Sequence, residues 1–94
     1  MNELIIDLRE VNTKQELHNL LSSKFGFPDW YGNNWDAFWE MITDTKTVTM
    51  PNRLILFGFK EFSEKLPKDA KIFQECFADL KQKYPLIACE VIYS

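Results

Sequence analysis

Two carboxylates one helical turn apart, Asp36 and Glu40, are the residues whose types and spacing could perform chemistry. Paired acids can serve as general acid and base in glycoside hydrolysis, but that reaction needs a cleft and two different carboxyl pKa values. We expect neither condition on the exposed face of one helix. A small enzyme that uses Asp36 and Glu40 as acid and base remains an alternative to a binding protein.

Other sequence signals also favour a protein that is not an enzyme. The chain contains no GxSxG, P-loop or GxGxxG motif. Its one histidine, His18, lies on an expected helix with polar residues among its neighbours, so we predict a solvated surface residue.

Negative charge and aromatic rings are concentrated in the same part of the chain, residues 25–45. This segment has four acids and no lysine or arginine, whereas the rest of the chain has 10 acids and 11 bases. The formal net charge of −3 therefore comes from this segment. It also holds seven of the fourteen aromatic residues, including all three tryptophans. Tryptophan and tyrosine around a compact charged group are typical of protein–protein hot spots. The alternative is that the acids form a solvated face while the tryptophans cover the core.

The elements that position these residues are expected to be a loop and a helix. Residues 29–34 are predicted as the loop, and Asn33 or Asn34 can cap a helix that runs to about Thr43. A helical wheel of about 100° per residue places four apolar side chains on a core face: Ala37, Phe38, Met41 and Ile42.

The acids fall on the outer face of the same expected helix, one turn apart. Thr43 lies beside them, and Trp35 and Trp39 border the two faces. Like charges at this spacing mildly destabilise an isolated helix. Asp36 and Glu40 therefore suggest a partner that supplies the cations.

The rest of the pattern alternates strands with helices. Strands are predicted at residues 4–8, 53–59 and 86–93, with the first two buried. Helices are predicted after the Thr13–Glu16 capping box, at 60–66 up to Pro67, and before Pro85. The core face of the last helix is predicted to hold Ile72, Phe73, Cys76, Phe77 and Leu80. This alternation predicts an α/β fold of two layers, with a three-stranded parallel sheet and helical crossovers, in a single domain spanning residues 1–94.

The sequence argues against a signal peptide, a membrane helix, a metal or cofactor site and direct binding of nucleic acid. The first eight residues lack the basic start and cleavage site of a signal peptide. No stretch approaches the roughly 20 apolar residues of a membrane helix, so a cytoplasmic location is expected by default. Cys76 and Cys89 are predicted to be buried, reduced thiols, and neither a metal nor a cofactor is expected. An acidic chain whose aromatics alternate with acids is not expected to bind nucleic acid directly.

The segment Pro28–Glu40, PDWYGNNWDAFWE, resembles the central motif of the barstar family. That motif is an aromatic pair, glycine, a variable residue, asparagine, an apolar residue, Asp-Ala, an apolar residue, tryptophan and an acid. Leu17-His18 is similar to a Leu-His pair of the family, and the order of elements fits along the chain. The resemblance implies a two-layer α/β fold and an intracellular immunity protein that inhibits a secreted ribonuclease of the barnase type.

The resemblance also implies roles for individual residues. Asp36 and Glu40 would enter the nuclease's substrate site in place of RNA phosphates, and Trp30 would stack on its catalytic histidine. Asp79, on the last helix, matches a peripheral acid after a gap set by the core pattern. The predicted partner-binding residues are Trp30, Tyr31, Asn34, Trp35, Asp36, Trp39, Glu40, Thr43, Asp44 and Asp79.

Departures from the family pattern bear on the identity of the partner. Glu40 replaces an aspartate, Trp30 replaces a tyrosine, and the loop 44–52 is longer and lacks a Gly-Trp pair. We predict one-to-one binding of a basic extracellular-type ribonuclease or nuclease toxin by a chain that is monomeric when free and makes no membrane contact. The alternatives are the same fold binding a non-nuclease basic partner, as an adaptor or antitoxin, and a purely structural subunit.

Overall fold

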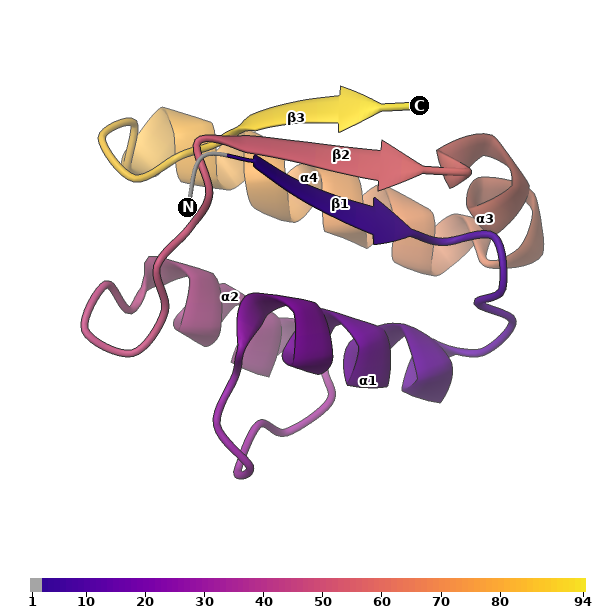
Figure 1. Ribbon diagram of the computed structural model, residues 1–94, viewed down its shortest axis with the longest axis horizontal. Coiled ribbons are helices and arrows are strands. Elements are labelled where there is room, and N and C mark those ends of the chain that lie inside the picture. The colour runs from indigo at the N-terminus through magenta and orange to yellow at the C-terminus, as the bar shows by residue number, and fades with distance from the viewer. Residues whose placement is uncertain (1–2) are drawn as a thin grey trace.

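Strands and helices alternate in the computed structural model, which describes residues 3–94. Within those residues, three strands and four helices follow one another: β1 Glu3–Asp7, α1 Lys14–Phe25, α2 Trp35–Thr43, β2 Arg53–Phe57, α3 Phe59–Lys65, α4 Pro67–Lys83 and β3 Glu90–Tyr93. The strands form one parallel sheet in the order β1-β2-β3. Helices α1 and α2 connect the first two strands and lie together on one side of the sheet (Figure 1). The predicted fold class is confirmed.

Among residues 3–94, helices cover one face of the sheet and leave the other bare, so the prediction of two fully buried strands is wrong. Ile6 and Leu56 are fully buried against the helical layer, whereas Ile5 is 53% exposed and Ile92 is 38% exposed. The parallel register aligns Ile5, Ile55 and Ile92 in one row on the outer face. Side chains alternate between the two faces of a strand. An apolar run therefore cannot reveal whether its second face is covered.

Helix α1 begins and ends where the sequence signals place it. The hydroxyl of Thr13 accepts a hydrogen bond from the backbone N–H of Glu16 at 3.1 Å, and the Glu16 carboxylate accepts from the N–H of Thr13 at 3.1 Å. These two bonds complete the predicted capping box. The helix ends at Gly26, whose φ of 71° lies in the left-handed region that glycine adopts without strain.

Helix α3 begins one residue earlier than predicted because the chain turns sharply at Gly58. This residue has a φ of 75°, and a Cβ atom there would collide with Cγ of Arg9. Strand β2 therefore ends at Phe57, and Phe59 becomes the first residue of α3.

Helix α4 and strand β3 each depart from the prediction at one point. Pro67 opens α4, a position where its missing N–H leaves no hydrogen bond broken. Phe73 is fully buried as predicted, but Ile72 is 37% exposed. Strand β3 begins only at Glu90 because the chain first makes a turn at residues 85–87, where Leu86 is 99% exposed.

The two cysteines lie in different environments. Cys76 is buried, Cys89 is half-buried, and both are free thiols. Burial raises the pKa of each thiol to about 11, so both are protonated at neutral pH. Among residues 3–94, no helix is long and apolar enough to cross a membrane, and no three His, Cys, Asp or Glu side chains gather into a possible metal site.

Candidate functional site

Helix α2 packs one side into the core and turns its two acids to solvent, as the helical wheel predicts. Phe38 is fully buried and Ile42 is 1% exposed, whereas Asp36 and Glu40 are exposed. Neither carboxylate has a hydrogen-bond or ion-pair partner among residues 3–94. Both therefore present an unneutralised charge to an approaching molecule.

The loop before α2 is fixed by asparagine side chains. Asn34, one of the two predicted caps, accepts a hydrogen bond at Oδ1 from the N–H of Ala37 at 2.7 Å and donates from Nδ2 to the Gly32 carbonyl at 3.1 Å. Asn33 has a φ of 52°, and its Nδ2 donates to Oδ1 of Asn19 in α1 at 3.2 Å. The start of α2 is thus tied to α1, and the Asn34 side chain acts as a helix cap.

Two of the three tryptophans lie where a partner can reach them. Trp30, in the loop, is 69% exposed. Trp39 is half-buried, with its ring centroid 6.2 Å from that of Tyr84 and 5.7 Å from the Lys83 ammonium. Lys83 and Tyr84 were missed by the sequence reasoning because they stand at the end of α4, far along the chain. Only the packing of α4 beside α2 brings them to Trp39.

Trp35 is held by contacts within the chain. Its Nε1 donates a 2.9 Å hydrogen bond to Oδ1 of Asp69, in the first turn of α4. Its ring meets those of Phe38 and His18 edge-on, with centroids 5.4 Å and 4.7 Å apart. Trp35 therefore orients α2 against α1 and α4. Asp69 is another residue that the sequence did not single out, since nothing local connects it to Trp35.

The prediction that His18 is a surface residue is wrong. Its side chain is fully buried, and Nδ1 shares a 2.6 Å hydrogen bond with the Tyr31 hydroxyl. Burial lowers the pKa of His18 to about 4 and raises the pKa of Tyr31 well above its usual value, so both groups are neutral at pH 7. Helical position could not reveal this, because the loop that covers His18 is distant in sequence.

Tyr31 also occupies a different place from the one expected of a partner-binding residue. Only 8% of it is exposed, and its ring packs against that of Phe27 with centroids 4.7 Å apart. Of the Trp30–Tyr31 pair, Tyr31 thus anchors the loop in the core, while Trp30 faces solvent.

Thr43 and Asp44 shape the C-terminal end of α2, and both are half-buried. The Thr43 hydroxyl donates to the backbone carbonyl of Trp39 at 2.8 Å. The Asp44 carboxylate accepts from the Thr47 hydroxyl at 2.7 Å and from the Lys46 N–H at 3.1 Å. These bonds, that of Thr47 first, hold the pKa of Asp44 below its usual range, so the group stays charged.

We call four of the predicted residues the acidic surface: Trp30, Asp36, Trp39 and Glu40. Asp36 stands three residues before Trp39 and four before Glu40 on α2, so its side chain is a neighbour of both. Asp79 is exposed on α4, one turn before Lys83, and within residues 3–94 no hydrogen bond or ion pair joins its side chain to α2. Neither Asp36 nor Glu40 lines either of the two surface hollows described for this chain.

Two comparisons with known proteins identify the family of this chain. The family model described as barstar (barnase inhibitor) matches residues 1–91, which include every element from β1 to the start of β3. A Bacillus subtilis (strain 168) protein named "Putative ribonuclease inhibitor YrdF" is 34% identical over 91 residues, which are 93% of this chain and 98% of that relative. With a matching parallel sheet and helix order, the chain belongs to the barstar (barnase inhibitor) family.

Proposed function

We propose that this protein is a non-catalytic inhibitor that blocks a basic ribonuclease by binding its active site one-to-one through the acidic surface. The observation that carries the proposal is the pair Asp36 and Glu40, exposed, one turn apart and without a cationic partner among residues 3–94. A site that binds RNA phosphates presents cationic groups, and these bind carboxylates through short, charge-assisted hydrogen bonds. The two acids can therefore occupy such a site in place of phosphates.

The family and the named relative support this class of activity. The family model is described as a barnase inhibitor, and the relative is named as a ribonuclease inhibitor. A location in the cytoplasm is part of the proposal, because an inhibitor kept inside the cell protects the cell's own RNA.

The aromatic residues account for how a small surface could bind tightly. Trp30 offers a large apolar side chain to a partner at little conformational cost, since 69% of it is already exposed and Tyr31 anchors the loop. The local excess of acids attracts a basic protein over distance and raises the association rate. Together these features favour fast association followed by burial of the indole.

RNA cleavage by a purified barnase-type ribonuclease, titrated with this protein, tests the proposal. We expect cleavage to fall to zero at one equivalent, and Asp36→Lys to abolish inhibition while the far-ultraviolet circular dichroism stays unchanged. Glu64→Lys is the matched control, because Glu64 is an exposed acid on α3, outside the acidic surface. Equal inhibition by Asp36→Lys and the wild type would refute the proposed surface.

The same acidic surface could instead hold a basic partner that is not a nuclease, as an adaptor or antitoxin. Glu40, which is longer than the family's usual aspartate, is the residue that would change the partner. A panel of basic ribonucleases left fully active by the wild-type protein would favour this alternative.

A further inference from the structure

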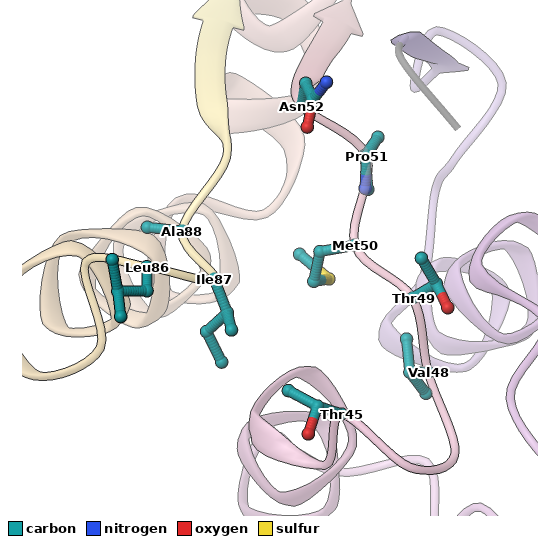
Figure 2. Close-up of a pocket in the computed structure, with 9 residues that line it drawn as sticks. All are labelled: Thr45, Val48, Thr49, Met50, Pro51, Asn52, Leu86, Ile87 and Ala88. Carbon is teal, nitrogen blue, oxygen red and sulfur yellow. The ribbon is translucent and has the colours of Figure 1, made fainter.

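A hollow of about 220 Å³ lies beyond the C-terminal end of α2. One wall is the loop that follows α2, and the other is the turn between α4 and β3. In Figure 2, Met50 of the loop and Ile87 of the turn lie on opposite sides of the space, and Thr45 bounds it next to the end of α2. Within residues 3–94 the lining carries no charged side chain. Three of its nine residues are polar and six are apolar, so its chemistry suits an apolar group with polar atoms beside it.

Hydrogen bonds fix both walls of this hollow. The Tyr84 carbonyl accepts from the N–H groups of Ile87 at 3.1 Å and Ala88 at 3.2 Å, which closes the turn. The Asn52 carbonyl accepts from the N–H of Glu90 at 2.9 Å, which joins the loop to the strand that follows the turn. The hollow is therefore preformed, and binding would not require the unfavourable entropy change of ordering its walls.

The floor of the hollow is also anchored in the core. Val48 is 4% exposed and Pro51 is buried, although the sequence predicted this segment only as a loop. Met50, with its flexible and polarisable side chain, is half-buried and can adjust to an inserted group.

Both walls of the hollow follow residues at or next to the acidic surface along the chain. Thr45 comes directly after Asp44, which follows the last residue of α2. On the other side, Tyr84 contacts Trp39 two residues before Leu86, in the opposite wall. At that wall Leu86 is 99% exposed. A partner bound over Trp39 would need to extend only a short way along α2 to reach it.

We propose that this hollow is a second contact site for the same basic partner and receives an aromatic or branched apolar side chain. The segment that delivers this side chain would also carry lysine or arginine. The end of α2 has the negative pole of the helix dipole, no basic residue in its last turn, and the acids Glu40 and Asp44. The inference deepens the proposed function and rests on it for the nature of the partner.

Two neutral substitutions at the hollow test the proposal with the nuclease. Leu86→Asn removes an apolar contact at the rim, and Thr45→Trp fills the space, while both residues are exposed enough to spare the fold. We expect each variant to bind the nuclease about tenfold more weakly, the effect of a moderate interface residue. Ile5→Asn is the matched control, because Ile5 is an exposed residue on the outer face of the sheet. Wild-type inhibition with unchanged affinity in both variants would overturn the proposal.

A second measurement separates this inference from the proposed function. Amide chemical shifts of the wild-type protein are followed by NMR during titration with the capped peptides Arg-Phe-Arg and Arg-Ala-Arg. We expect shifts at residues 45–52 and 86–88 with the phenylalanine peptide alone. If no nuclease is inhibited but these shifts appear, the proposed function fails and the apolar site stands. Equal shifts with both peptides, or none at these residues, would overturn the apolar site.

Discussion

His18 in α1 and Tyr31 in the following loop share a buried hydrogen bond of 2.6 Å between Nδ1 and the hydroxyl. The His18 ring also meets Trp35, the first residue of α2, with centroids 4.7 Å apart. Together the two contacts join α1, the loop that follows it and α2, the three segments that position the acidic surface. The Nε2 atom of His18 has no hydrogen-bond partner among residues 3–94. In a protonated ring both nitrogens carry a proton, and the Nε2–H would have no acceptor among those residues.

We predict that His18 makes the stability of the protein depend on pH between about 4 and 6.5. The pKa of His18 is about 4 in the folded protein, against 6.5 for a free imidazole. In this range the unfolded chain binds the proton more readily, so the free energy of unfolding falls as the pH decreases and is fully restored above pH 6.5. The pKa difference corresponds to about 3 kcal/mol at most. Urea unfolding at pH 7, 6 and 5 measures it.

His18→Gln serves as the reference for that series, because all other titrating groups are shared. The wild type is expected to be more stable than the variant at pH 7, and the difference should shrink at pH 5. A difference that stays constant across the series would show that His18 does not titrate on unfolding in this range.

Removing the hydrogen-bond acceptor of Trp35 should reduce the stability of the folded protein. Asp69→Ala leaves the indole N–H without its 2.9 Å partner, and a half-buried hydrogen bond of this kind contributes about 1 kcal/mol. Asp79→Ala, on the same helix, is expected to leave the free energy of unfolding within about 0.5 kcal/mol of wild type. Chemical denaturation of the three proteins makes the comparison, and equal losses in both variants would contradict a positioning role for Asp69.

Neutralising Glu40 should have opposite effects on stability and on binding. Asp36 and Glu40 repel one another across one turn, and Glu40 also stands near the negative end of α2. Glu40→Gln should therefore raise the free energy of unfolding by about 0.3 kcal/mol, while weakening nuclease binding by tenfold or more. Thermal unfolding and titration calorimetry on the same samples check both signs. A less stable variant would show that Glu40 has a favourable partner within the chain.

Trp30 should affect binding without affecting the fold. Its indole is 69% exposed, so Trp30→Ala is expected to change the free energy of unfolding by less than about 0.5 kcal/mol. A buried tryptophan at an interface contributes about 2 kcal/mol or more, so the affinity should fall at least about 30-fold. Binding should also shift the tryptophan emission of the wild type to shorter wavelength, a shift that the variant should lack in large part. Unchanged affinity would place Trp30 outside the interface.

Local sequence signals were sufficient for the type and order of the elements and for the two faces of α2. The Thr13–Glu16 capping box, Gly26 and the Asn34 cap act within a few residues of one another, so their effects can be read from the sequence. The same is true of the exposed pair Asp36 and Glu40, because helical periodicity alone separates them from Phe38 and its buried neighbours.

Contacts between distant segments were decided only by the tertiary structure. His18 is buried because a loop packs over it, Trp35 is oriented by Asp69 of α4, and Lys83 lies beside Trp39. The outer face of the sheet is likewise bare because no helix within residues 3–94 lies on that side. The residues of a single strand could not show this. The sequence by itself determined which side chains α2 turns outward, since backbone geometry imposes that pattern. The packing of the helices decided the rest: which of these side chains are held by contacts within the chain, and which stay available to a partner.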